Sequence, residues 1–171
     1  AFGQGVTASP IQLVTAASTI ANGGGRMMPY LVEAVLDQHD EVETWTDPRV
    51  DRQVVSEKTA QTVALMMEAV TEEGGTGTRA KVDGYRVAGK TGTAQKVENG
   101  VYSATKRLSS FVGFLPADRP EVAIAVIVDS PTIGSKYGGI VAAPAFSEIG
   151  AFVMRYLGVP PDAVSGAVVT A

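Results

Sequence analysis

The chain has 171 residues, of which 45% are hydrophobic and 19% charged, and its formal net charge is −4. This composition predicts one folded domain with a real core, and it lacks both the low hydrophobicity of a disordered chain and the basic stripe typical of a nucleic-acid-binding protein. The sequence has no cysteine, which excludes disulfides, thiolate metal sites and a cysteine nucleophile.

The sequence shows no membrane span or signal peptide, because no stretch approaches the ~20 apolar residues that a spanning helix needs. The chain begins Ala1-Phe2-Gly3 without an initiator Met, so we expect it to be a piece of a longer protein. Its single histidine, His39, lies in the polar run 37–41. This pattern predicts a surface turn, and we expect neither a metal site nor a cofactor.

The first predicted element is a helix that begins after Ser9. Ser9 is a good N-cap, Pro10 suits the first helical position, and apolar residues follow at helical spacing. Asn22 and the glycines 23–25 predict the end of this helix. The glycine run does not indicate a phosphate loop, because it follows a helix and no Gly-Lys-Ser/Thr comes after it.

A small hairpin is expected next, since residues 30–36 and 42–45 are rich in β-formers and flank the polar turn 37–41. Ser56 is the candidate N-cap of a second helix that ends at residues 73–75. Within this helix Met66 and Met67 continue an apolar pattern at helical spacing, which favours core packing for both.

Three strands follow, over residues 85–97, 108–115 and 122–128. The link 116–121 is short and predicts antiparallel pairing of the second and third strands. The link 98–107 is longer and polar and is expected to be a loop. The last strand is an apolar run typical of a strand covered on both faces.

The last predicted element is a helix of about four turns that opens at Gly138-Gly139, has Pro144 in its first turn and ends at Gly158. The whole order predicts an α+β fold, an antiparallel three-strand meander flanked by helices. Three strands make a thin domain, so we expect further elements from sequence outside this chain. Residues 1–160 should form one unit and 161–171 a tail of small residues.

The stretch Lys90-Thr91-Gly92-Thr93 carries the clearest chemistry. Side chains alternate along a strand, so Lys90 and Gly92 face one way and the two threonine hydroxyls the other, where they can bind a carboxylate. Gly92 would let another backbone approach closely, and at a sheet edge an extended peptide could pair with this strand. A free N–H at Thr93 could stabilise an oxyanion. These features suit a peptide substrate with a terminal carboxylate.

The same stretch also matches the letters of a phosphate loop, from Gly84 through Gly89-Lys90-Thr91. A phosphate loop turns sharply between a strand and a helix. Residues 85–88 are instead β-prone, and Gly92-Thr93 does not begin a helix. We therefore interpret this match as an accident of spacing and keep nucleotide binding as the last alternative.

The run from Gly89 to Lys96 resembles the third motif of penicillin-binding proteins, in which Lys-Thr-Gly lines the active site. Residues 2–12, 109–116, 136–139 and 143–146 are also similar to class B members of this family, in the order the family has them. The resemblance covers roughly residues 2–160. Gln95-Lys96 is most similar to the division, or septal, branch and its sporulation relatives.

The resemblance implies a partial fold of the penicillin-binding and serine β-lactamase type and a D,D-transpeptidase that cross-links peptidoglycan. In this family a serine attacks a peptide ending in D-Ala-D-Ala, and β-lactams acylate the same serine. By this resemblance Lys90 helps hold the proton network, and Thr91 and Thr93 bind the carboxylate. The Thr93 N–H is half of the oxyanion hole. Gln95 is expected to contact substrate, and Tyr137 to form an aromatic wall.

The family has two further motifs, Ser-x-x-Lys, which contains the nucleophile, and Ser-x-Asn. Both come before the Lys-Thr-Gly motif in the chains of the family. Residues 103–106 fit the letters of the first, but they follow the Lys-Thr-Gly strand and are expected to form a surface loop. No Ser-x-Asn occurs in the chain. The sequence therefore predicts the C-terminal part of a transpeptidase domain that is inactive alone.

The resemblance places the parent protein at the outer face of the bacterial inner membrane, held by an N-terminal anchor outside this chain. It implies as partners the stem peptide, β-lactams, the preceding part of the same domain and other cell-wall or divisome proteins. A D,D-carboxypeptidase or serine β-lactamase of the same superfamily stays open, since motif chemistry alone cannot separate water from amine acceptors. A non-catalytic module that binds a peptide carboxylate stays open as well.

Overall fold

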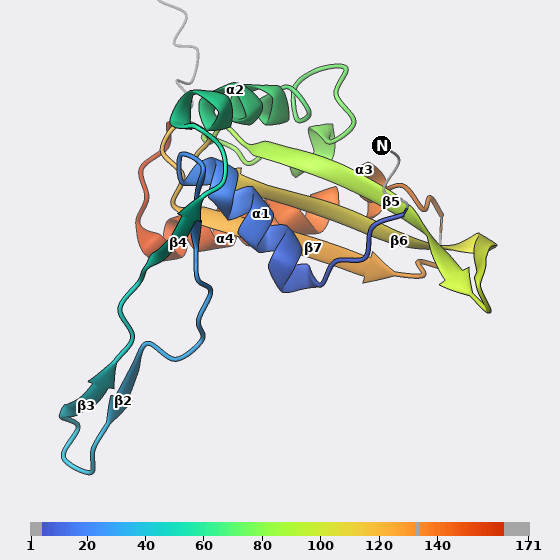
Figure 1. Ribbon diagram of the computed structural model, residues 1–171. Helices are drawn as coiled ribbons and strands as arrows, with labels where there is room; N and C mark the ends of the chain where they lie inside the picture. Colours follow the sequence, from blue (N-terminus) through green and yellow to red (C-terminus); the bar gives the residue numbers. More distant parts are fainter. Residues whose placement is uncertain (1–4, 133, 163–171) are drawn as a thin grey trace, which may run out of the picture.

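The computed structural model describes residues 5–132 and 134–162, and it confirms the α+β class (Figure 1). The chain runs in the following order: α1 (Pro10–Ala21), β1 (Gly25–Met27), β2 (Ala34–Leu36), β3 (Val42–Trp45), β4 (Val50–Gln53), α2 (Glu57–Glu68), the 3-10 turn η1 (Thr78–Ala80), β5 (Ala88–Glu98), β6 (Val101–Leu115), β7 (Val122–Asp129), α3 (Gly138–Val141) and α4 (Ala143–Leu157).

The ends of the helices follow the expected capping chemistry. Ser9 accepts from the Gln12 N–H, and the Gln12 side chain accepts from the Ser9 N–H, which completes a capping box at the start of α1. Ser56 caps α2 with one such bond, its hydroxyl accepting from the Thr59 N–H. At the other end of the chain Gly158 terminates α4 with a left-handed backbone, φ 66°.

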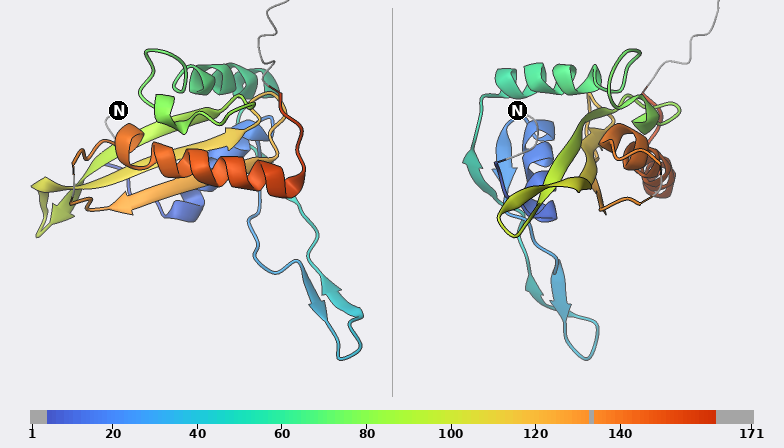
Figure 2. Two further views of the ribbon diagram at one scale, coloured as in Figure 1. Left: turned by 180° about the vertical axis from the view of Figure 1, so that it is seen from behind. Right: turned by 90° about the vertical axis from the view of Figure 1, so that its right-hand side faces the viewer.

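The main sheet has the order β5-β6-β7, with both pairs antiparallel as expected. Helices α1 and α2 lie on one face of it and α3 and α4 on the other, so the sheet is the middle of three layers (Figure 2). Phe111 of β6 packs edge-on against Phe146 of α4, with 4.7 Å between ring centroids. Phe114 of the same strand packs on the α1 and α2 side. The two faces of β6 therefore supply two separate cores.

The expected loop over residues 98–107 is wrong. Strand β5 runs to Glu98 and β6 begins at Val101, so only Asn99 and Gly100 join them. Both have positive φ, 53° and 80°, which is the backbone of a tight two-residue hairpin turn. Asn-Gly is the usual sequence for that turn, so the signal was present although the polar residues after it favoured a loop.

Two short strands were missed, and one core prediction fails in part. β1 and β4 form a separate antiparallel pair beside α1, and both are short. In α2 the inward stripe includes Ala60, Ala64 and Met67, and the last two pack against the Phe114 core. Met66 lies off this stripe and is 66% exposed, because it is two positions beyond Ala64 on the helix.

One guanidinium holds three chain segments together at the start of β5. Arg86 forms ion pairs with Asp118 at 2.9 Å, Asp162 at 3.3 Å and Glu68 at 3.5 Å. The Arg86 N–H also donates to Asp162 Oδ1 at 2.9 Å. The pKa of Arg86 is raised because the three carboxylates outweigh the opposing effect of burial. Residues after α4 are thereby fixed against the strand that carries the Lys-Thr-Gly motif.

We expect Arg86→Met to flatten the acid dependence of stability. Burial would raise the pKa of Asp118, but its hydrogen bond with Asp162 and the charge of Arg86 lower it overall. Because the pKa of Asp118 is lower in the folded than in the unfolded chain, its carboxylate stabilises the folded state at pH values above the unfolded pKa, about 4. This stabilisation is lost as the pH falls through the folded pKa. Urea unfolding at about pH 3, 4, 5 and 7 should show a smaller loss of unfolding free energy toward acid in the variant.

Arg119→Met is the matched control, because Arg119 is exposed and directly follows Asp118 in the chain. This substitution removes the same charge as Arg86→Met. At neutral pH, Arg86→Met should lower the free energy of unfolding by about 1–3 kcal/mol, since it leaves the largely buried Asp162 carboxylate without its ion-pair partner. Equal acid slopes for the two variants would show that Arg86 does not set the pKa of Asp118.

Candidate active site

The Lys90–Thr93 stretch lies on the outermost strand of the main sheet. β6 pairs with β5 on one side only, and no described strand pairs with the other side of β5. β5 thus meets the condition that the sequence argument set for strand addition, an edge position in the sheet. An unpaired edge offers backbone N–H and C=O groups to an extended peptide, which is the geometry of strand addition.

The two faces of β5 separate the lysine from the threonines, as the alternation predicted. Ala88 packs in the core on the α1 and α2 side, so Lys90 and Gly92, two and four residues on, share that face. Thr91 and Thr93 lie on the face of α3. Lys90 is exposed, and its ammonium donates to the Thr91 carbonyl at 2.8 Å.

Both threonine hydroxyls have partners that sequence reasoning did not find. Thr93 Oγ1 accepts from the Gly138 N–H at 3.0 Å, and Thr91 Oγ1 is 3.0 Å from Thr76 Oγ1. The Thr93 hydroxyl keeps its own proton and can still donate to a carboxylate. Thr76 and Gly138 are far from Thr93 in sequence. Only the glycine-rich composition around each indicated a close backbone approach.

Glycines allow this close packing of backbone against the strand. A Cβ on Gly138 would overlap the carbonyl oxygens of Gly92 and Ser110, and a Cβ on Gly139 would overlap the Thr76 carbonyl oxygen. Gly92 itself faces Ser110, whose Oγ occupies the space that a Gly92 side chain would need. The structure therefore gives Gly92 a packing reason within the sheet, beside the substrate approach expected from the sequence.

Gln95 and Tyr137 both lie near the Thr93 end of the threonine pair. The Gln95 amide donates to the Ser103 carbonyl at 3.1 Å, so in this structure it bonds to the neighbouring strand. Tyr137 directly precedes Gly138, whose N–H bonds to Thr93, and its side chain is 70% exposed. Tyr137 is thus available beside the site, whereas Gln95 is partly engaged within the sheet.

Residues 103–106, the look-alike of the nucleophile motif, belong to strand β6 and do not form the connecting loop that was expected. They bulge from the ladder, because Gln95 pairs with Arg107 and Val97 with Tyr102. The Lys106 ammonium bonds to Glu98 at 2.6 Å, and this hydrogen bond raises the pKa of Lys106. A lysine held protonated cannot take the proton of Ser103. Lys106 therefore does not serve Ser103 as the lysine of a Ser-x-x-Lys motif would, and the Ser103 hydroxyl instead accepts from the Lys106 N–H and bonds to Glu98.

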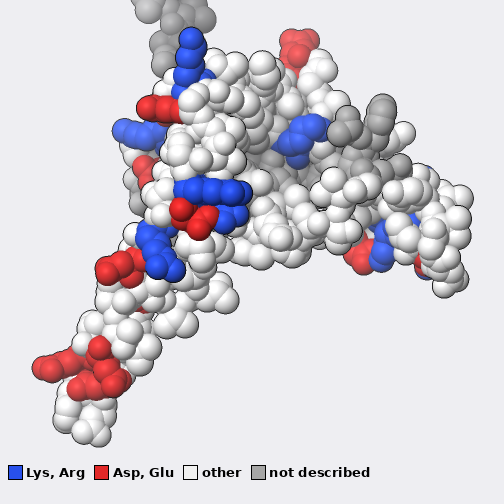
Figure 3. Space-filling view, in the orientation of Figure 1, with Lys and Arg blue, Asp and Glu red and all other residues white. Residues whose placement is uncertain are grey.

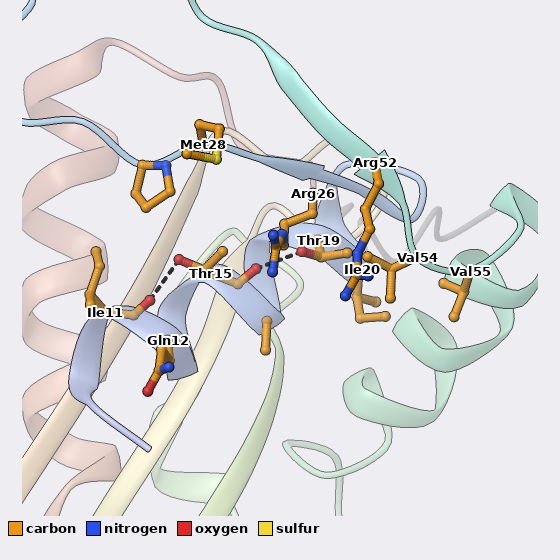
Figure 4. A pocket seen from close by; sticks show the side chains of 12 residues that line it. Ile11, Gln12, Thr15, Thr19, Ile20, Arg26, Met28, Arg52, Val54 and Val55 are labelled. Atoms are coloured by element: carbon orange, nitrogen blue, oxygen red, sulfur yellow. Dashed lines mark hydrogen bonds between the residues drawn. The ribbon is translucent and has the colours of Figure 1, made fainter.

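A hollow in the described surface lies elsewhere, between α1 and the β1–β4 pair (Figure 4). Its volume is about 640 Å³, and Ile11, Ile20, Met28 and Val54 contribute apolar surface to it. None of the six candidate residues, five on β5 and Tyr137 directly before α3, lines it. It is an open groove on the side of α1 that the main sheet does not cover.

No helix in the part of the chain that the structure describes has the length and apolar character to cross a membrane.

Residues 1–151 match the family described as the penicillin binding protein transpeptidase domain. Stage V sporulation protein D of Bacillus subtilis is 43% identical over 94% of this chain and 25% of its own length. The peptidoglycan D,D-transpeptidase FtsI of Escherichia coli is 36% identical over 96% of this chain and 26% of its own. The chain thus spans about a quarter of these relatives.

Among solved structures, penicillin binding protein 3 of Mycobacterium tuberculosis complexed with ampicillin superimposes with a TM-score of 0.80. It is 33% identical and is covered over 38% of its chain, against 96% of this one. The sequence match, the fold and the edge strand with its Lys-Thr-Gly motif agree. This chain belongs to the transpeptidase domain family of class B penicillin-binding proteins.

Proposed function

We propose that this chain is the C-terminal part of a D,D-transpeptidase that cross-links peptidoglycan stem peptides through a serine acyl-enzyme. The observation that carries the proposal is the unpaired edge of β5, with Lys90 on one face and the hydroxyls of Thr91 and Thr93 on the other. A peptide ending in a carboxylate can add to this edge as a strand and place its carboxylate at the two hydroxyls.

The residues have separate roles in this proposal. Thr93 donates its hydroxyl proton to the substrate carboxylate, while the Gly138 N–H holds the oxygen in place. Thr91, oriented by Thr76, supplies the second hydroxyl. Lys90 provides positive charge next to the reacting group. The N–H of Thr93 points in the same direction as that of Thr91 and serves as one oxyanion donor. Tyr137 forms an aromatic wall of the cleft, and Gln95 contacts the substrate further along β5.

The attacking serine and the second oxyanion donor come, in this proposal, from the preceding part of the same domain. Support comes from surfaces that a complete domain would cover. The groove on α1 exposes Ile11 and Met28, and the outer side of α4 exposes Phe152 and Tyr156. Uncovered apolar surface of this kind marks contact sites.

The setting of the whole protein is likewise a proposal. The name of the relative from Escherichia coli, a peptidoglycan D,D-transpeptidase, supports a parent protein that works on peptidoglycan, so we place it at the outer face of the bacterial inner membrane, held by an anchor outside this chain. The ampicillin complex of a structural neighbour supports β-lactams as ligands of the same site. Division or sporulation proteins are the expected partners.

The test is the rate of acylation of the longer protein by a fluorescent penicillin. We expect Thr93→Val to slow acylation roughly 10- to 100-fold, because it removes a hydrogen bond to a charged carboxylate, about 1.5–3 kcal/mol. Thr105→Val is the matched control, since Thr105 is exposed on β6 away from the edge. An unchanged rate for Thr93→Val, or equal loss in both variants, would refute the assignment of the carboxylate site.

The acceptor is settled by product analysis of the same protein with an amine and water in competition. Transfer to the amine supports a transpeptidase. Release of the free acid alone would favour a carboxypeptidase or β-lactamase. Peptide binding with no acylation, even in the longer protein, would favour a non-catalytic binding module.

A further inference from the structure

The hairpin of β2 and β3 stands away from the rest of the molecule. Residues 30–48, called the arm below, project beyond the helices and the main sheet in all three views (Figures 1 and 2). Within the described residues β2 and β3 pair only with each other. The tip is closed by Asp37, whose carboxylate accepts from the N–H groups of His39 and Glu41 at 2.7 and 3.0 Å. The arm is thus an ordered hairpin without a described neighbour.

One face of the arm is apolar and uncovered. Leu36 pairs with Val42 and Ala34 with Trp45, so these side chains share a face. Leu36, Val42 and Trp45 are 50%, 57% and 53% exposed. A two-stranded hairpin on its own is marginally stable in water and needs a further strand or a packed surface. The arm therefore has the properties of a binding surface, which a partner covers in the functional complex.

The arm is strongly acidic, and this charge limits which partners can bind to its exposed face. It carries six carboxylates and no Lys or Arg: Glu33, Asp37, Asp40, Glu41, Glu43 and Asp47. The acidic side chains gather toward the end of the arm in Figure 3. None of them forms an ion pair with a described residue. In the rest of the chain the twelve other carboxylates are outnumbered by fourteen Lys and Arg. The arm is therefore the negative part of the molecule.

This combination selects one class of partner. Anionic lipids and nucleic acids are repelled by six carboxylates. A basic polypeptide is attracted, and both outer edges of the β2–β3 pair have backbone groups that an added strand can use. We propose that the arm is a docking surface for a basic, strand-forming segment of another protein, which pairs with the hairpin edge and covers Trp45. This docking is separate from the acylation chemistry and does not depend on it.

Trp45 gives a direct readout, because it is the single tryptophan of the chain and lies on the arm. The probe is a synthetic peptide of alternating Lys and Val, titrated into the full chain while tryptophan emission is recorded. We expect a shift of the emission to shorter wavelength as Trp45 leaves water. The apparent Kd should rise at least tenfold between about 0.05 and 0.5 M salt, because exposed charges are screened.

The variant E33K/E43K should weaken binding at least tenfold, whereas the control D83K/E121K makes the same charge change at exposed positions of the body and should bind like the unaltered chain. Thermal unfolding of both variants checks that each is folded. Neither variant should alter penicillin labelling of the longer protein, so this test fails or succeeds apart from the proposed function.

Several results would overturn the docking proposal. These are no emission shift with the Lys-Val peptide, an equal shift with a Glu-Val peptide, or equal binding by the two charge variants. An emission shift with vesicles of 70% phosphatidylcholine and 30% phosphatidylglycerol would assign the arm to a membrane. A shift that grows with protein concentration alone would assign it to a second copy. If Trp45 is already buried in the longer protein without any peptide, the arm contacts the preceding part of the same protein.

Discussion

Gly138→Ala in the longer protein is expected to slow penicillin acylation by about 10- to 100-fold, although it leaves Lys90, Thr91 and Thr93 unchanged. The Gly138 N–H is the donor that holds Thr93 Oγ1, and an added Cβ would overlap the carbonyl oxygens of Gly92 and Ser110. Both obstacles are backbone atoms of the sheet, so α3 must move away and the hydrogen bond to Thr93 must lengthen. The loss equals about 1.5–3 kcal/mol for a misplaced donor to a charged group.

The measurement is the acylation rate with fluorescent penicillin, accompanied by thermal unfolding. Overpacking of this kind also costs about 1–3 kcal/mol of stability, so some decrease in Tm is expected with the loss of rate. Gly25→Ala is the matched control, because a Cβ there makes only an ordinary contact, 3.4 Å from Asn22 Nδ2. An acylation rate equal to that of the unaltered protein would show that contact between α3 and β5 does not position Thr93.

Phe111→Ala is expected to give the largest loss of stability, about 3–5 kcal/mol. Phe111 is fully buried and packs edge-on with Phe146. Its ring also fills the space beneath β5, since a Cβ on Gly89 would overlap it and one on Gly77 would lie 2.7 Å from its Cε2. The cavity would therefore open directly under the strand that carries Lys90.

Urea unfolding measures this loss, and Phe152→Ala is the control because Phe152 is 60% exposed. A domain is stable by only about 5–15 kcal/mol, so Phe111→Leu is added as a variant that keeps most of the volume and stays folded. Equal losses for Phe111→Ala and Phe152→Ala would mean that Phe111 does not form the core between the sheet and α4.

The elements that sequence reasoning placed correctly have strong local signals. Ser9 with Pro10 fixed the start of α1, and the apolar run 122–128 gave β7 within one residue. The strand that carries the Lys-Thr-Gly motif was also expected. Each of these depends on neighbouring residues, which is why pattern and propensity were sufficient.

The errors have physical reasons as well. β1 and β4 are three and four residues long, and β4 is Val50-Asp-Arg-Gln, so neither has an apolar pattern. The bulge at residues 103–106 concealed the hairpin that Asn99-Gly100 indicated. Thr76 and Gly138 were missed because only the packing of α3 and the loop 69–77 on β5 brings them to the threonines. No spacing within the sequence predicts such a contact.

The central claim is that this chain supplies one wall of the active site and that the nucleophilic serine lies outside it. The most direct measurement is a peptide map by mass spectrometry of the longer protein and of the isolated chain, each after reaction with benzylpenicillin. We predict one acyl group in the longer protein, on a serine that precedes residue 1, and none on the isolated chain. Acylation of Ser103, or of any other serine within residues 1–171, would contradict this account.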